Sequence, residues 1–148
     1  MNRRSFLKTS TVAGAATIAA PNIVRAHNLN SRMNIAMIGL GNRGQRNTGY
    51  FSAENIVALC EVDQLKLSLV AKFQPKARRE ADFRKLFDHE KEFDAVVIST
   101  PEHNHAFATL PALQLGKNVY CEKPLTYNIE EARVVRMAAR NANVITQM

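Results

Sequence analysis

An acid, a base and a proline follow one another in the stretch VYCEKPL, at residues 119–125. Its first three residues have the character of a β-strand, so Glu122 and Lys123 are expected directly after a strand end. A lysine that is partly removed from water can hold a substrate hydroxyl or relay its proton, and a proline fixes the exit of the chain. The stretch fits either an ordinary loop or the edge of an active site, and the rest of the chain has to distinguish the two.

A glycine loop is the second candidate feature. IGLGNRG places Gly39, Gly41 and Gly44 in the pattern G-x-G-x-x-G, with Asn42 and Arg43 between them. The pattern is a weak indicator alone, but here it follows an expected strand and opens an expected helix. Glycine lets the backbone turn tightly and approach a pyrophosphate, and the helix N-terminus presents free N–H groups to it. Arg43 could add positive charge beside the phosphates.

Acidic residues after the next apolar run complete the requirements of a dinucleotide site. Glu61 and Asp63 follow the loop by about 20 residues, the usual spacing for an acid that accepts hydrogen bonds from a ribose. A carboxylate there repels the 2′-phosphate of NADP, so the predicted cofactor is NAD and NADP is disfavoured. Glu61 is the better candidate, because Asp63 is expected to cap the following helix.

Alternating strand and helix patterns are expected to position these residues. Strands are expected at 33–39, 55–62, 94–100, 117–121 and 144–148, and helices at 64–73, 105–116 and 128–143, with a short helix from Asp82. The strands are apolar throughout, which favours a parallel sheet covered on both faces. The predicted class is therefore α/β, a doubly wound parallel sheet of the Rossmann type.

Apolar spacing also predicts the buried faces of two helices. These faces comprise Leu65, Leu69 and Phe73 in the first helix, and Ile129, Ala132, Val135 and Ala139 in the last. Pro111 is expected to kink the helix at 105–116 or to mark its effective start, and Gly116 to cap its end.

The carboxyl ends of parallel strands lie along one edge of a sheet, the edge that also carries the glycine loop. Two strand ends are therefore expected to converge on the cofactor: Ser99, Thr100, Pro101 and His105 from one, and Glu122, Lys123 and Pro124 from the other. Glu122 is expected to bind the nicotinamide ribose. No carboxylate or cysteine is spaced to complete a metal site around His103 and His105, so no metal is predicted.

The first 26 residues have the pattern of an export signal peptide. They begin with the pair Arg3 and Arg4, continue with a weakly apolar stretch at 9–20, and end with small residues that favour cleavage near Ala26. This pattern resembles a twin-arginine (Tat) signal, which implies export by the Tat machinery, for example to the periplasm. Residues 27–32 are expected to be a linker and residues 33–148 the dinucleotide-binding domain.

Composition excludes several other classes. The chain has 148 residues, of which 46% are hydrophobic and 22% charged, which is typical of a globular protein. The net charge is +7, but four basic residues and no acid lie in the first 26 residues. The remaining excess is too mild to indicate nucleic-acid binding, and no apolar run has the length of a membrane-spanning helix.

The motifs GLGNRG, VVISTPEHNHAFATLPAL, GKNVYCEKPL and EEARVVRMAAR resemble the glucose–fructose oxidoreductase / inositol dehydrogenase / MocA family, over nearly all of residues 33–148. The resemblance implies that Lys123 is catalytic, that the Lys123–Pro124 peptide is cis, and that His105 lies near the nicotinamide. Glu61 stands where the family more commonly has aspartate. The family also has a C-terminal α/β domain that lines the substrate pocket and forms the oligomer interface. That domain is absent here, so the chain alone is expected to be inactive, and to be a homo-oligomer when full-length.

Three functions remain open from the sequence. The first is an exported NAD-dependent oxidoreductase that acts on a small carbohydrate, a sugar, polyol or glycoside. The second is a glycosidase that uses NAD transiently, by oxidation at C3, elimination and re-reduction. The third is a non-catalytic nucleotide-binding module.

Overall fold

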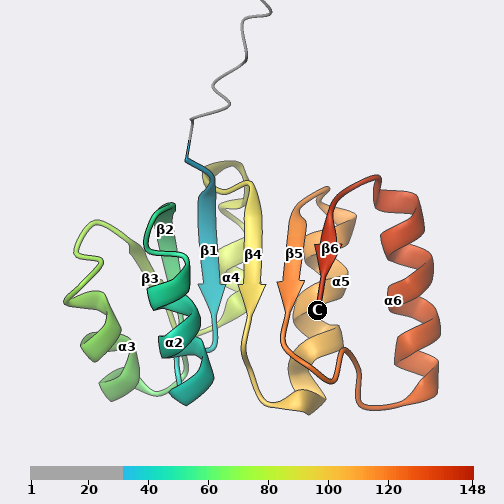
Figure 1. Ribbon diagram of the computed structural model, residues 1–148, viewed down its shortest axis with the longest axis horizontal. Coiled ribbons are helices and arrows are strands. Elements are labelled where there is room, and N and C mark those ends of the chain that lie inside the picture. Colours follow the sequence, from blue (N-terminus) through green and yellow to red (C-terminus); the bar gives the residue numbers. More distant parts are fainter. Residues whose placement is uncertain (1–31) are drawn as a thin grey trace, which may run out of the picture. The chain divides into compact units, whose positions relative to one another are not determined.

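The computed structural model describes residues 32–148 as a six-stranded sheet in the order β3-β2-β1-β4-β5-β6, with every neighbouring pair parallel. The strands are β1 (Asn34–Ile38), β2 (Asn55–Cys60), β3 (Arg78–Glu80), β4 (Ala95–Ile98), β5 (Asn118–Cys121) and β6 (Thr146–Gln147). All strands point the same way, so their carboxyl ends share one edge (Figure 1). The predicted signal peptide and residues 27–31 of the predicted linker lie outside the described residues.

Five α-helices and two short 3-10 helices connect the strands. The α-helices are α2 (Asn42–Tyr50), α3 (Gln64–Ala71), α4 (Phe83–Phe87), α5 (His105–Gln114) and α6 (Ile129–Ala142), and the 3-10 helices are η1 (Glu90–Glu92) and η2 (Glu102–Asn104). Within the described residues, none of these helices combines the length and apolarity needed to cross a membrane.

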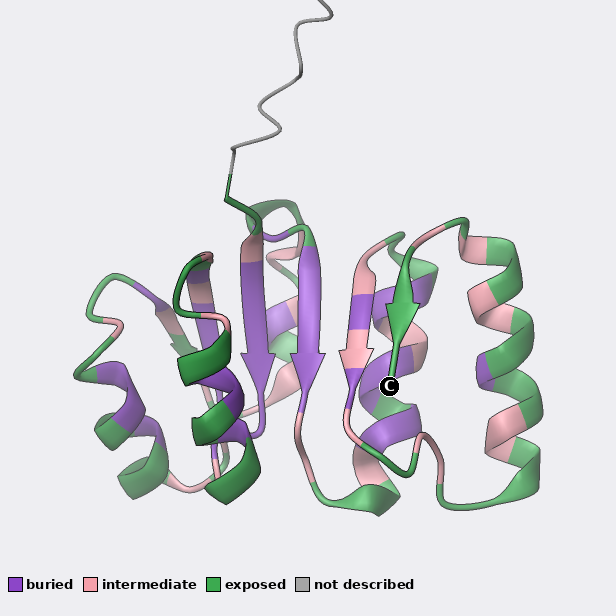
Figure 2. Cartoon of the chain, viewed as in Figure 1, coloured by how far each residue is buried: buried purple, intermediate pink, exposed green. Residues whose placement is uncertain are grey.

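Both faces of the sheet are buried. Alternate residues of β1 point to opposite sides, so Ile35 and Met37 join one apolar cluster while Ala36 and Ile38 join the other. Helix α3 covers the first side and helices α4, α5 and α6 the second (Figure 1). The central strands β1 and β4 are buried along almost their whole length (Figure 2). The doubly wound parallel sheet predicted from the sequence is therefore confirmed.

The buried face of α3 differs from the predicted one. Leu65 and Phe73 are 69% and 78% exposed, and Leu69 is 45% exposed. The buried residues are Leu67, Val70 and Ala71, which follow the i, i+3, i+4 spacing of a helix face just as well. Because this segment is apolar almost all round, spacing alone could not select the side that meets the sheet. In α6, Val135 is buried as predicted, but Ile129 is 73% exposed.

Two further details correct the sequence-based reading. Helix α5 begins at His105 and continues through Pro111, so the proline does not mark its start. Strand β3 was not predicted, because its sequence RRE has no apolar residue; it is an edge strand that pairs only with β2. The predicted caps are present: Asp63 accepts hydrogen bonds from the first turn of α3, and Gly116 has a φ of +68° after α5.

Candidate nucleotide-binding site

A cavity of about 520 Å³ lies at the carboxyl edge of the sheet, between the glycine loop and the ends of β2 and β4. The cavity lies at the end of β1, between the ends of β2 and β4. At this level of the sheet, Ile38 of β1 is in register with Cys60 of β2 and with Ile98 of β4. Nine of the predicted cofactor-binding residues line it: Gly39, Gly41, Asn42, Arg43, Glu61, Asp63, Ser99, Thr100 and Pro101. The strand order reverses here, which is where doubly wound folds bind their ligands.

Each of the three positions in the loop requires glycine for a different structural reason. Gly39 has a φ of +85°, and a Cβ there would come within 2.6 Å of the carbonyl carbon of Ser99. A Cβ on Gly44 would collide with the carbonyl oxygen of Gly39, so this glycine lets α2 pack closely against the end of β1. A Cβ on Gly41 would meet nothing nearer than the Lys66 side chain at 3.7 Å. Gly41 therefore leaves the backbone open toward the cavity.

The N-terminus of α2 faces this loop without a side-chain cap. Gly41 is the N-cap residue and offers no capping side chain, and the first turn contains no acid. The N–H groups and the positive end of the helix dipole are therefore available to an anion. Together with the open backbone at Gly41, this arrangement fits the pyrophosphate of a dinucleotide.

Glu61 is fixed at the other end of the cavity by two backbone groups. Its Oε2 accepts a hydrogen bond from the Leu40 N–H at 2.8 Å, and its Oε1 accepts one from the Asp63 N–H at 3.1 Å. Each carboxylate oxygen has a second lone pair that can accept a hydrogen bond from a ribose hydroxyl. Asp63 is occupied differently: it caps α3 and pairs with Lys66 at 3.2 Å, which lowers the pKa of its carboxyl. The choice of Glu61 over Asp63 as the ribose acceptor agrees with this geometry.

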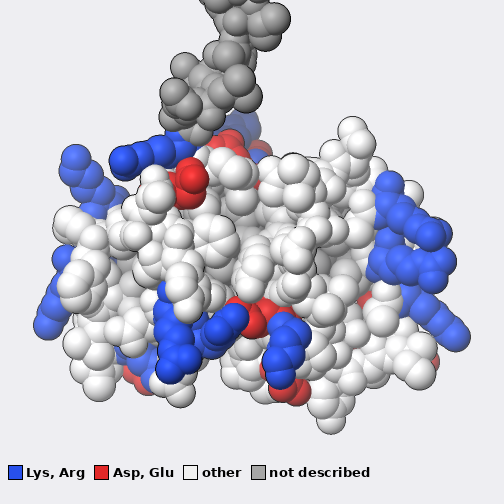
Figure 3. Space-filling view, in the orientation of Figure 1, with Lys and Arg blue, Asp and Glu red and all other residues white. Residues whose placement is uncertain are grey.

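Glu122 is held in place by two side chains of helix α2 and by Tyr120. Its Oε1 accepts hydrogen bonds from Arg43 Nε at 2.7 Å, from Asn47 Nδ2 at 2.9 Å and from the Tyr120 hydroxyl at 3.3 Å. Although burial opposes it, the hydrogen bonds from Asn47 and Arg43 lower the pKa of Glu122. Figure 3 shows cationic and acidic side chains meeting at this edge of the molecule. The predicted ribose ligand is thus already engaged with α2 through one of its two oxygens.

His105 lies in the core rather than in the cavity. The ring is 1% exposed, with Nδ1 at 2.6 Å from the Pro124 carbonyl oxygen and Nε2 at 2.8 Å from that of Thr100. Carbonyl oxygens only accept, so both contacts are hydrogen bonds when the imidazole carries two protons. The Cys121 side chain and these two carbonyls raise the pKa of His105 to about 9 against the opposing effect of burial. This geometry favours a role in holding two strand ends together over direct catalysis.

Lys123 lies on the exposed turn that follows β5. The Lys123–Pro124 peptide is cis, as the family resemblance implied. Neither Lys123 nor its neighbours Glu122 and Pro124 line the cavity itself. Glu122 is hydrogen-bonded to Arg43 at the cavity wall, and Pro124 is linked to Thr100 there only through His105.

The residues near the site that were not predicted include Asn47, Lys66 and Tyr120. Asn47 could have been found from its place three residues after Gly44, on the face of α2 that must meet the sheet. Lys66 lines the cavity from the first turn of α3, and no motif pointed to it.

The residues present fit NAD. Besides the open glycine backbone and the uncapped helix, the hydroxyl oxygen of Thr100 is buried at the cavity wall without a hydrogen-bond partner. Such a group gains from a polar ligand. Among residues 32–148, no group of three or more His, Cys, Asp or Glu side chains is placed to hold a metal ion, and both cysteines are buried free thiols.

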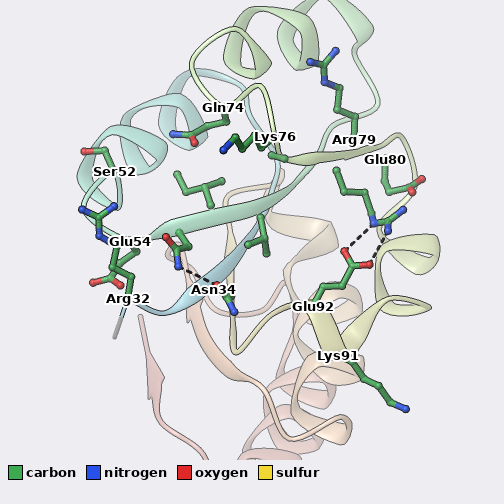
Figure 4. Close-up of a pocket in the computed structure, with 15 residues that line it drawn as sticks. Arg32, Asn34, Ser52, Glu54, Gln74, Lys76, Arg79, Glu80, Lys91 and Glu92 are labelled. Carbon is green, nitrogen blue, oxygen red and sulfur yellow. Dashed lines mark hydrogen bonds and ion pairs between the residues drawn. The ribbon is translucent and has the colours of Figure 1, made fainter. Parts of the chain in front are cut away.

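A second hollow lies at the opposite, amino-terminal edge of the sheet and is larger, at about 1,090 Å³ (Figure 4). Its wall mixes acids and bases, among which Arg78 and Glu92 form an ion pair at 2.7 Å. It lies at the start of β1 and β2, away from the glycine loop and the motif residues. The glycine loop, the uncapped helix end, Glu61 and the buried Thr100 hydroxyl all belong to the smaller cavity, which is therefore the candidate site.

Family models match both parts of the chain. Residues 33–148 match the glucose–fructose oxidoreductase / inositol dehydrogenase / MocA model, described as an oxidoreductase family with an NAD-binding Rossmann fold. The chain belongs to this family. Residues 1–20 match the signal sequence of the twin-arginine translocation pathway. The predicted family, cofactor and type of signal are thereby confirmed.

Individual members of the family are similar over most of this chain. Oxidoreductase P35 of Formosa agariphila is 32% identical over 120 residues, which are 78% of this chain and 37% of the relative. The scyllo-inositol 2-dehydrogenase (NAD(+)) of Bacillus subtilis is 29% identical over 76% of this chain and 34% of the relative. The crystal structure of myo-inositol 2-dehydrogenase from Lactobacillus plantarum matches with a TM-score of 0.72 at 28% identity, over 79% of this chain and 36% of that one. The chain thus spans about a third of the length of the relatives that it matches.

Proposed function

We propose that this chain is the nucleotide-binding part of an exported, NAD-dependent oxidoreductase that acts on a sugar, polyol or glycoside. The observation that carries the proposal is a juxtaposition at one sheet edge. A glycine loop with an uncapped helix lies beside Glu122, which Arg43 contacts directly and which precedes Lys123. The inositol dehydrogenases among the family members support the carbohydrate substrate class.

Some residues of the site bind the nucleotide, and Lys123 transfers the proton of the substrate. The glycine loop and the start of α2 hold the pyrophosphate, and Glu61 accepts hydrogen bonds from the adenosine ribose. NAD, when bound, supplies the acceptor for a hydride from a carbinol carbon. Lys123 holds the substrate hydroxyl and takes or relays its proton as the carbonyl forms. His105 keeps the turn of Pro124 fixed to Thr100 through its two ring nitrogens.

Export follows from the twin-arginine signal. We propose that the signal is cleaved near Ala26 and that the mature protein begins at His27, in the periplasm or an equivalent exported location. Mass spectrometry of the exported protein tests this, because a mature mass that begins elsewhere contradicts the proposed cleavage site.

Calorimetric titration with NAD⁺ and NADP⁺ tests the binding half of the proposal on the 148-residue chain. We expect binding of NAD⁺, weaker binding of NADP⁺, and no oxidation of a sugar, since the relatives are more than twice as long. Absence of NAD⁺ binding would overturn the proposal.

The alternative functions are separated by turnover measurements on a chain as long as the relatives. Accumulation of NADH indicates net oxidation, whereas an NAD-dependent glycosidase regenerates NAD⁺ in every cycle. Loss of turnover in Lys123→Ala with NAD⁺ binding retained excludes a non-catalytic module.

A further inference from the structure

Asn47 connects three elements of the candidate site through one buried amide. Its side chain is 2% exposed, on the inner face of the phosphate-binding helix α2. Its Nδ2 donates to Ser99 Oγ, after β4, and to Glu122 Oε1, after β5, each at 2.9 Å. The two protons of a single amide thus join the carboxyl ends of two neighbouring strands to the helix that begins at the glycine loop.

The buried Asn47 amide fixes the relative positions of its partners, because each of its two N–H groups donates to a different one. A polar group removed from water costs free energy unless it is hydrogen-bonded, and hydrogen bonds to a charged group are stronger than those between neutral groups. Glu122 also receives a hydrogen bond from a charged donor, Arg43, four residues earlier on the same helix. Helix α2 therefore holds the Glu122 carboxylate from two positions of one helical face.

The location matters because of the way a dinucleotide spans this edge. With Glu61 as the ribose acceptor, the adenosine half of a bound dinucleotide would lie over the end of β2, and the nicotinamide half would lie across the ends of β4 and β5. Asn47 touches the second region and none of the first.

We propose that Asn47 is a positioning residue for the nicotinamide half of NAD. It acts through Ser99 and Glu122, setting the distance between the phosphate-binding helix and the turn that carries Lys123. This inference rests on the proposed function. It implies that disturbing Asn47 weakens the binding of NAD⁺ while leaving ADP, which ends at the phosphates, almost unaffected.

Asn47→Asp in the 148-residue chain is the direct test. The substitution keeps the shape, removes both donors and places a second carboxylate against Glu122. We expect NAD⁺ affinity to fall roughly tenfold, the effect of one lost hydrogen bond to a charged group, and ADP affinity to change less than about twofold. The NAD⁺ loss should shrink as the pH is lowered toward 5, because two adjacent carboxyl groups then share a proton. Gln45→Glu, the same change of type on the exposed side of α2, should alter both affinities by one common factor.

The double variant Asn47→Asp/Glu122→Gln tests the role of Asn47 through the ratio of NAD⁺ to ADP affinity, which a general loss of stability would not change. It removes the repulsion and restores an amide–carboxylate hydrogen bond with donor and acceptor exchanged. The ratio of NAD⁺ to ADP affinity should therefore rise above that of Asn47→Asp, to the value measured for Glu122→Gln alone. If Asn47→Asp does not fold, Asn47→Ser gives the same comparison without added charge.

The outcomes separate this inference from the proposed function. An Asn47 variant that weakens NAD⁺ and ADP equally, or weakens neither, overturns the positioning role, as does a double variant no better than Asn47→Asp. If the unsubstituted chain binds ADP but not NAD⁺, the proposed function and this inference both fail.

Discussion

Arg43 and Glu122 are 79 positions apart in the sequence, yet their side chains meet at 2.7 Å between Nε and Oε1. This pair joins the glycine loop to the turn that carries Lys123. It is half-exposed on the arginine side, where the side chain is 52% accessible, so its contribution to stability is small. Its importance is therefore expected in ligand binding rather than in folding.

Removing the Arg43 side chain should separate its contribution to ligand binding from its contribution to stability. We expect Arg43→Ala to lower NAD⁺ affinity by about tenfold, because the phosphates lose a neighbouring cation, while the free energy of unfolding changes by less than about 1 kcal/mol. Titration calorimetry and urea unfolding measure the two quantities. Arg46→Ala, on the exposed side of the same helix, is the matched control, and an equal loss of affinity in both variants would contradict a specific role for Arg43.

The glycines of α2 and its loop should respond differently to the same substitution. Gly44→Ala is expected to prevent folding or to destabilise it by several kcal/mol, because its Cβ would run into the Gly39 carbonyl oxygen. Gly49→Ala, with nothing within 4 Å of the new Cβ, should stabilise the chain by about 0.5–1 kcal/mol. Gly41→Ala should leave stability nearly unchanged and abolish measurable NAD⁺ binding, because the methyl group projects toward the cavity. Full NAD⁺ binding by Gly41→Ala would place the pyrophosphate elsewhere.

His105 should make stability depend on pH. Its pKa is raised to about 9 in the folded chain, from about 6.5 when unfolded. A raised pKa means that the folded state binds the proton more tightly. The stabilisation is therefore complete below pH 6.5 and is lost as the pH rises to 9 and beyond, by on the order of 3 kcal/mol.

Urea unfolding at pH 6 and pH 9.5 measures this loss. His105→Gln should show a smaller decrease over the same interval, because its side chain does not titrate. The difference between the two proteins isolates the contribution of His105 from that of the other side chains. Equal pH dependence in both would show that the ring is neutral in the folded state.

Glu61 should determine the choice between the two nicotinamide cofactors. Glu61→Ala removes the acceptor for the ribose hydroxyls and for the Leu40 and Asp63 N–H groups. We expect NAD⁺ affinity to fall more than about tenfold, and the preference for NAD⁺ over NADP⁺ to shrink, because the repulsion of a 2′-phosphate is lost. Glu80→Ala, at the end of the neighbouring strand, is the control for the change in net charge. An unchanged ratio of affinities would assign the discrimination to another group.

The sequence contained enough information for the sheet and its functional edge. The central strands are continuous apolar runs, and parallel strands necessarily bring their carboxyl ends together, so the motif residues could be assigned to one edge without a structure. Asp63 could be assigned as the cap of α3 from its place before the helix, and this left Glu61 as the candidate for the ribose acceptor.

Other features depend on tertiary contacts that have no local signal. Strand β3 is held by pairing with β2 and not by its own polar sequence, and α3 has two apolar faces from which packing selects one. The resemblance implied a place near the nicotinamide for His105. Its hydrogen-bonded environment depends on the carbonyl oxygens of Thr100, five residues earlier, and of Pro124, on the turn after β5. The Asn47 bridge likewise required the positions of three elements at once.

β1 is made first, yet it lies at the centre of the sheet and pairs with β4, whose neighbouring residue Asp94 contacts Asn34 across 60 positions. The site therefore cannot exist on a nascent chain until the residues through Lys123 have emerged, and its assembly waits on contacts of long sequence separation. During synthesis, nucleotide binding is therefore expected only after β1, β2, β4 and β5 have paired. A dinucleotide present at that moment would stabilise the newly closed domain by mass action, so cofactor supply and folding yield should rise together.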